Sequence, residues 1–221
     1  DEAAAQAARG EWDLALCMSL QDVEAVQHWQ LPRLFVMLSM VGADSGLSGR
    51  AKDEYVESLM PLFAQVDIAF ISEKKRRDWG WDAPVVISGI DPDEYGGYRG
   101  NQARVLRVGN IPGGRNQVQG SGIPEELLSE AIPSSVVGVN PTGVAFPADF
   151  EELKEQYREH RLLLNTLNDE QEDGCNLVVL EAMAIGMPVV SIANSSSPIV
   201  DGHNGFISDE PAYLRDRIGQ L

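Results

Sequence analysis

The chain has 221 residues, of which 17 are Lys or Arg and 34 are Asp or Glu, so its formal charge at neutral pH is −17. Such an acidic surface repels phosphate backbones, which argues against a general nucleic-acid-binding role. Apolar residues make up 43% of the chain, enough for a packed core, and this excludes global disorder. No apolar run reaches the roughly 18–20 residues that a membrane span requires.

Two features bear on the compartment in which the chain works. The first ten residues, DEAAAQAARG, lack the basic and apolar regions of a signal peptide. Cys17 and Cys175 are too few for a disulfide framework, and two lone thiols fit a reducing environment. We therefore predict a cytoplasmic location.

Short apolar strands alternate with helices in the N-terminal part of the chain. Strands are predicted at 13–19, 33–40, 67–72 and 84–88, where apolar runs end in Ser, Gly or Asp. Helices are predicted at 21–30, 52–66 and 73–80, with Gly80 ending the last of them. Residues 89–102 are rich in Gly, Asp and Pro and lack periodicity, so they are interpreted as a linker.

The same alternation resumes after the linker. Strands are predicted at 104–110, 134–140, 161–166 and 188–193, and helices at 123–131, 149–160, 176–186 and 212–221. Strict alternation of strands and helices implies parallel strands with helical crossovers. The predicted fold class is therefore α/β, with two Rossmann-like units, each built on a parallel sheet.

The segment with the most chemistry runs from 172 to 206. A predicted strand ends at Thr166, an acidic loop follows, and a helix begins near 174–176, where unpaired N–H groups could bind a diphosphate. Asp173 and Glu181 are two helical turns apart and share a face. Glu181 lies between VVL and AMA, and a carboxylate there needs a partner. A sugar diol could be that partner. The alternative is that Glu181 faces solvent and needs no partner.

This segment resembles a known family. LVVLEAMAIGMPVV followed by IVDGHNGF is similar to the E-x7-E region of retaining glycosyltransferases of the GT-B fold, notably glycosyltransferase family 4, the glycosyl transferases group 1. The resemblance implies that Glu181 holds the ribose hydroxyls of a nucleotide sugar. Asp173, or its neighbour Glu172, would be the first acid of this pattern, the catalytic residue that lies against the donor sugar. The helix start, made of Gly174, Cys175, Asn176 and Leu177, would receive the diphosphate.

Two further stretches match the family at its donor site. RVLRVGNIPGGRNQVQG resembles the G-R-x-x-x-x-K pattern, whose two cations neutralise the donor diphosphate. Counting from Gly109, Asn110 stands at the Arg position and Arg115 at the Lys position, and a guanidinium binds phosphate oxygens well. The alternative for Arg115 is a solvated loop residue without a ligand. Asn194 and Ser195 replace the family's Gly-Gly and could bind phosphate or sugar oxygens.

A looser resemblance at 70–95 sets the predicted domain boundaries. This stretch is similar to the last strand and linker of the N-terminal GT-B domain. It implies a partial, acceptor-side Rossmann-like domain at 1–88, a linker at 89–102, and a nucleotide-sugar-binding domain at 103–221. Complete enzymes of this kind are much longer, so the N-terminal domain is expected to be truncated.

Other polar motifs are discounted. DPD at 91–93 is interpreted as turn chemistry rather than as a metal motif. KKRR at 74–77 is interpreted as a solvated helix face, which leaves at most weak peripheral contact with a membrane. His28, His160 and His203 lack metal-ligand spacing, so neither a metal nor a cofactor is predicted.

These observations predict a function. The expected protein is a retaining, metal-independent glycosyltransferase whose partners are a nucleotide-sugar donor and a sugar or glycan acceptor, with no nucleic acid and no transmembrane segment. The alternative is a non-catalytic nucleotide-sugar-binding or partner-docking module derived from such an enzyme.

Overall fold

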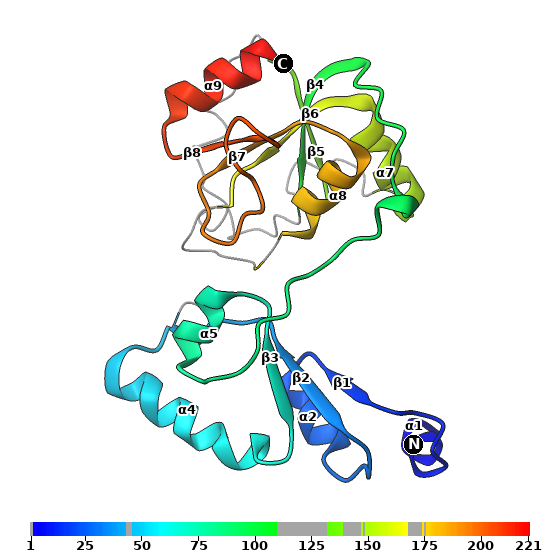
Figure 1. Cartoon of the computed structure of the whole chain (residues 1–221), viewed down its shortest axis with the longest axis vertical. Coiled ribbons are helices and arrows are strands. Elements are labelled where there is room, and N and C mark those ends of the chain that lie inside the picture. Colours follow the sequence, from blue (N-terminus) through cyan, green and yellow to red (C-terminus); the bar gives the residue numbers. More distant parts are fainter. Residues whose placement is uncertain are drawn as a thin grey trace. The chain divides into compact units, whose positions relative to one another are not determined.

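The computed structural model describes residues 2–42, 46–109, 132–138, 147, 149–167, 174 and 176–221. The chain divides into two compact units, Asp1–Ser88 and Gly89–Leu221 (Figure 1). Each unit holds one fully parallel sheet, with strand order β1-β2-β3 in the first and β5-β4-β6-β7-β8 in the second. The predicted α/β class with two parallel sheets is therefore confirmed.

The first unit follows the predicted alternation closely. Its elements are α1 (Glu2–Ala8), β1 (Ala15–Cys17), α2 (Leu20–Val26), β2 (Arg33–Met37), α4 (Gly49–Phe63), β3 (Asp67–Phe70) and α5 (Glu73–Trp79). The alanine-rich helix α1 was not predicted. The strand predicted at 84–88 is reduced to one bridge, in which Phe70 pairs with Val85.

Local signals explain where the helices of this unit begin and end. Before α2, the Ser19 hydroxyl accepts from the Asp22 N–H and the Asp22 carboxylate accepts from the Ser19 N–H, which together form a capping box. Ser72 caps the start of α5 by accepting from the Lys75 N–H. Gly80 ends α5 at φ 73°, a left-handed conformation that favours glycine, as predicted.

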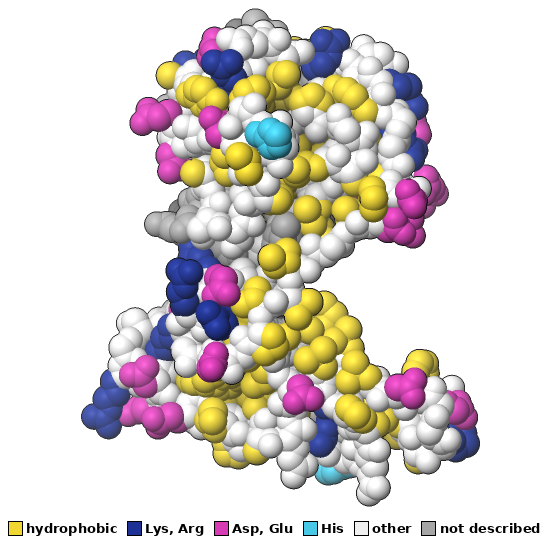
Figure 2. Space-filling model, in the orientation of Figure 1, with side chains coloured by type: hydrophobic (Ala, Val, Ile, Leu, Met, Phe, Trp, Pro, Cys, Tyr) yellow, Lys and Arg dark blue, Asp and Glu magenta, His cyan; other side chains and the backbone are white. Residues whose placement is uncertain are grey.

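The first sheet is covered on one face, and its other face is exposed along β1. Ala15 and Cys17 of β1 are buried in a core with residues of α2 and α4, whereas Leu14, Leu16 and Met18 on the other face are about half exposed, at 47%, 58% and 54%. Figure 2 shows apolar side chains gathered on the surface over β1 and β2. We call the exposed side chains of Leu14, Leu16 and Met18 the open apolar face.

One charged residue of this unit departs from the prediction. Lys75, in the KKRR stretch predicted to be a solvated helix face, is 2% exposed. The stretch is therefore only partly solvated, because one position of the short helix α5 faces the interior.

The second unit contains the larger sheet. Its elements are η1 (Pro92–Glu94), β4 (Gln102–Val108), β5 (Ser134–Val137), α7 (Phe150–Glu159), β6 (His160–Asn165), α8 (Leu177–Ile185), β7 (Val189–Ile192), β8 (Phe206–Ser208) and α9 (Pro211–Gln220). The short strand β8 was not predicted. The helix predicted at 123–131 lies outside the described residues.

Helices cover both faces of this sheet. Leu163 of β6 packs in a core with residues of α7 and α8, and its neighbours Leu162 and Leu164 pack on the opposite face with residues of α9. Thr166 and Ala193 directly follow β6 and β7, so both lie at the carboxyl edge of the sheet, as predicted.

The stretch predicted to be a linker packs onto the second unit. The Tyr98 hydroxyl donates to the carbonyl of Arg161 at 2.6 Å, and the N–H groups of Arg99 and Gly100 donate to the carbonyl of Arg158 at 2.8 and 3.0 Å. Gly100 has φ 57°, and a Cβ there would overlap the Tyr98 ring, so only glycine fits. Residues 95–100 are thus tied to α7 and β6.

Across the part of the chain that the structure describes, no helix combines the length and the apolar character needed to cross a bilayer.

Candidate functional site

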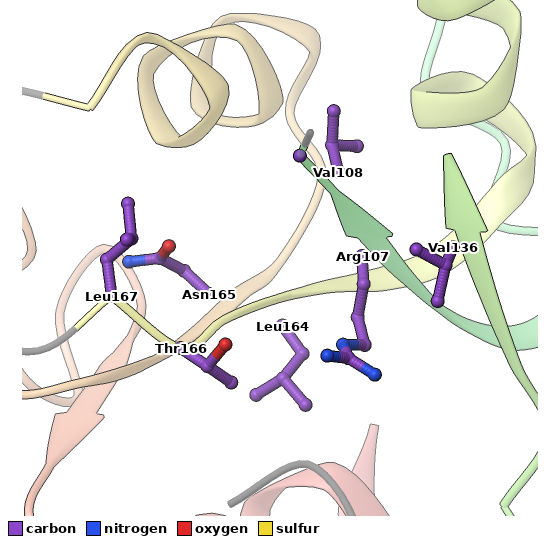
Figure 3. Close-up of a pocket in the computed structure, with 8 residues that line it drawn as sticks. Arg107, Val108, Val136, Leu164, Asn165, Thr166 and Leu167 are labelled. Carbon is purple, nitrogen blue, oxygen red and sulfur yellow. The ribbon is translucent and has the colours of Figure 1, made fainter. Parts of the chain in front are cut away.

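The second sheet has a topological switch point at β4, the second strand in its order. The chain passes from β4 to β5 on one side of β4, and then returns through α7 to β6 on the other side. In open parallel sheets, ligands bind outside the carboxyl ends of the strands at such a reversal. A pocket lies there, lined by Arg107, Val108, Gly109, Val136, Leu164, Asn165, Thr166 and Leu167 (Figure 3).

Arg107 brings a positive charge to this pocket. Its side chain leaves the strand on the face of Val105 and runs beside Leu164 toward the hydroxyl of Thr166 (Figure 3). Sequence reasoning did not select Arg107. The sequence feature that could have identified it is its position two residues before Gly109, at the predicted carboxyl end of the strand.

Polar groups also lie at the carboxyl edge of the sheet between β6 and β7. Asn165 donates from Nδ2 to Oγ of Ser191 at 3.0 Å, and Ser191, which is 0% exposed, donates in turn to the carbonyl of Ile192 at 2.8 Å. These bonds fix the ends of β6 and β7, between which α8 forms the crossover.

The N-terminus of α8 lies at the same edge, because this crossover must start where β6 ends. Asn176 caps the helix by accepting at Oδ1 from the Val178 N–H at 2.9 Å. Gly174 is buried with φ 74°, which favours glycine, and Leu177 is 53% exposed. A capped helix start therefore lies at the position where the resemblance to the family implies diphosphate binding.

Glu181 sits one turn further along α8 and is partly buried. Its Oε2 accepts a hydrogen bond of 2.8 Å from the hydroxyl of Tyr157 on α7. Burial raises the pKa of Glu181 above its usual value, and the Tyr157 bond and the positive charge of Lys154 oppose that rise. The partner that this carboxylate needs is thus, in part, a tyrosine.

Lys154 occupies an aromatic niche next to this pair. It is 6% exposed, donates to Oε1 of Glu151 at 2.8 Å, and lies 5.0 Å from the ring centre of Tyr95 and 4.9 Å from that of Phe150. Such cation–π contacts stabilise a partly desolvated ammonium group. The niche gives Lys154 a structural reason for its position.

The remaining donor-site candidates are placed as follows. The Gly109 N–H donates to the carbonyl of Val137, which orders the end of β4. Asn194 opens the turn after β7: its Oδ1 accepts from the Ser196 N–H at 2.9 Å, and Ser195 lies within that turn. Asn110, Arg115, Glu172, Asp173 and Cys175 lie outside the described residues.

No cation site is formed by the residues whose positions are described: they include no group of three His, Cys, Asp or Glu side chains placed to hold a metal ion. The buried His160 has a structural role instead. It is 2% exposed, its Nδ1 lies 2.8 Å from the carbonyl of Gln156, and burial lowers its pKa, so it serves the end of α7.

Solved structures share this fold. TarM matches with a TM-score of 0.68 and 14% identity over 94% of this chain and 47% of TarM. A variant of TarM from S. aureus, in complex with fondaparinux, α-GlcNAc-glycerol and UDP, matches with a TM-score of 0.67 and 14% identity over 94% and 48%. HepE from Anabaena, in complex with UDP-glucose, matches with a TM-score of 0.70 and 14% identity over 98% and 71%. The chain thus spans about half the length of TarM.

Comparison with sequences gives the family. A search of the curated proteins found no significant match. The family model described as glycosyl transferases group 1 matches residues 102–221, the part of the chain that holds the switch-point pocket and α8. The chain therefore belongs to the glycosyl transferases group 1.

Proposed function

We propose that this protein is a retaining, metal-independent glycosyltransferase that uses a nucleotide-diphosphate sugar as its donor. The observation that carries the proposal is the carboxyl edge of the second sheet, where the switch-point pocket with Arg107 and the start of α8 both lie in the segment that matches the family. HepE, which shares the fold, was solved with UDP-glucose, and the TarM variant with UDP.

The proposed donor site assigns a task to each group. The diphosphate lies against the start of α8, where backbone N–H groups and the helix dipole favour an anion. Arg115 supplies positive charge in place of a metal ion, stabilising the charge that develops as the diphosphate leaves, and Arg107 adds a cation at the same edge of the sheet. Glu181 receives the ribose hydroxyls, since an ionised carboxylate is a strong acceptor for a diol.

The sugar end of the donor belongs to the acidic segment before α8. Asp173 orients the donor sugar and stabilises the positive charge that it acquires in the transition state, and Glu172 is the alternative for this role. Residues 1–88 bind the acceptor, a sugar or glycan. Catalysis takes place in the cytoplasm, with no cofactor other than the donor itself.

The test compares binding with turnover. Purified protein is screened by thermal shift against UDP, GDP, ADP and their sugars, and release of nucleoside diphosphate is then measured for the donors that stabilise it. A glycosyltransferase releases nucleoside diphosphate, and Asp173→Asn removes turnover while nucleotide affinity stays nearly unchanged. If Glu172→Gln has that effect instead, Glu172 is the first acid. Donor binding without any release would favour a non-catalytic binding module and overturn the proposal.

A further inference from the structure

Tyr157 and Glu181 join the two helices that cover one face of the second sheet. Tyr157 lies on α7 and is 0% exposed, and its hydroxyl donates to Oε2 of Glu181 on α8 at 2.8 Å. Burial and the adjacent carboxylate raise the pKa of the Tyr157 phenol far above its usual range. The phenol therefore keeps its proton throughout the working pH range, so the direction of the hydrogen bond is fixed.

Two other groups face this carboxylate. Lys154, also on α7, contributes a positive charge that favours the ionised form of Glu181, and Tyr95 approaches from the segment before β4. Lys154 is itself held by Glu151 and by the rings of its niche. Among these groups, the Tyr157 hydroxyl is the one that contacts a carboxylate oxygen of Glu181 directly.

The geometry leaves Glu181 able to bind a ligand. A carboxylate has about four acceptor positions, of which the Tyr157 hydroxyl uses one on Oε2. Oε1 and the second lone pair of Oε2 are enough for a vicinal diol. A glutamate in a helix has several rotamers, and a bond to a rigid, buried ring selects among them, which lowers the entropy lost when a ligand binds.

We propose that Tyr157 is a positioning residue of the donor site: its hydroxyl orients the Glu181 carboxylate for the ribose diol of a nucleotide sugar. This inference rests on the role of Glu181 in the proposed function. It adds a residue that lies 24 positions earlier in the chain, on a different helix.

The experiment measures nucleotide affinity against pH for single and double variants. UDP, GDP and ADP are titrated by calorimetry into wild type, Tyr157→Phe, Glu181→Gln and the double variant. Tyr157→Phe is expected to weaken binding about 3- to 10-fold, the scale of coupling between residues in direct contact. Loss of the Tyr157 hydroxyl, which is a hydrogen-bond donor to Glu181, raises the pKa of Glu181. The acidic limb of the plot of nucleotide affinity against pH therefore moves to higher pH. In the Glu181→Gln background, Tyr157→Phe should have no further effect.

A matched control separates positioning from packing. Tyr98 packs against the same core, but its hydroxyl donates to a backbone carbonyl, so Tyr98→Phe should lower the melting temperature and leave both the affinity and the acidic limb in place. As a second probe that keeps the shape of the ring, 3-fluorotyrosine at position 157 is a stronger hydrogen-bond donor. It should move the acidic limb to lower pH.

The outcomes separate this inference from the proposed function. If Glu181→Gln weakens binding but the Tyr157 variants behave like Tyr98→Phe, Tyr157 is a packing residue and the inference fails while the donor site stands. If the wild type binds nucleotide and Glu181→Gln binds it equally well, the assigned role of Glu181 fails and takes the inference with it.

Discussion

Asn165 and Ser191 are hydrogen-bonded across the carboxyl ends of β6 and β7, at 3.0 Å, directly beside the switch-point pocket. Ser191 is fully buried, and removing its hydroxyl leaves the Asn165 amide without this acceptor. We predict that Ser191→Ala destabilises the second unit by about 1–3 kcal/mol, the cost of an unsatisfied polar group. Urea unfolding followed by far-ultraviolet circular dichroism measures this, and an unchanged midpoint would contradict it.

The second prediction concerns Arg107. Arg107→Ala should weaken the binding of a nucleoside diphosphate by about 1.5–3 kcal/mol, the range for a hydrogen bond to a charged group. The bare nucleoside should bind as before because it carries no phosphate. Arg104→Ala is the matched control: Arg104 lies on the same strand, is not among the residues that line the pocket, and donates to Ser135 and to the carbonyl of Ser134. Equal losses for both arginines, or for both ligands, would assign Arg107 a structural role.

Arg115 gives a parallel prediction from the family pattern. Arg115→Ala should also weaken nucleoside diphosphate binding by about 1.5–3 kcal/mol and spare the nucleoside. Calorimetric titration of both ligands checks this. If the nucleoside loses affinity to the same extent, Arg115 does not contact the diphosphate.

Stability should depend on pH through Glu181. Because burial raises the pKa of this carboxyl in the folded state, its ionisation disfavours folding, and stability is lost as pH rises through the raised pKa. Glutamine carries no charge to desolvate. The melting temperature of Glu181→Gln should therefore match that of wild type near pH 4 and exceed it near pH 7, at about the two ends of this titration. A variant that is less stable at the higher pH would show that the Tyr157 and Lys154 contacts outweigh burial.

In the first unit, Asp78 orders the loop that follows β2. Its Oδ2 accepts from the N–H groups of Val41 and Gly42, and its Oδ1 accepts from Nζ of Lys52 at 2.7 Å. Asp78→Ala should destabilise this unit by about 2–4 kcal/mol, and Lys52→Ala by less, since only the first removes all three bonds. Tryptophan fluorescence follows this unit selectively, because Trp12, Trp29, Trp79 and Trp81 all lie in it. Equal effects of the two variants would contradict the prediction.

Most strands and helices could be predicted because their signals are local. Apolar runs ended by polar residues mark the buried strands, and caps such as Ser72 and Gly80 mark the ends of α5. The strand β8 was missed because its three residues follow a turn and gain strand geometry from pairing with β7, which is a tertiary effect. Likewise, the linker pattern in 89–102 gave no sign that Tyr98 would dock on β6.

The candidate site was only partly predictable for the same reason. The motif pointed to Glu181 and to the start of α8, since both lie in one continuous segment. Arg107 depended on which face of β4 would meet the pocket, and Tyr157 on how α7 would pack against α8. Pairings between residues far apart in sequence are decided by the assembled core rather than by any local pattern.

The open apolar face of the first sheet, formed by Leu14, Leu16 and Met18, has a consequence for how the protein behaves in solution. Molecules that each carry a charge of −17 repel one another, and in dilute buffer this repulsion acts over about 30 Å, far beyond contact range. At physiological ionic strength the range of this repulsion falls to about 8 Å. Two molecules can then come close enough for their exposed apolar side chains to attract one another. Salt, which favours the solubility of many proteins, should here promote self-association.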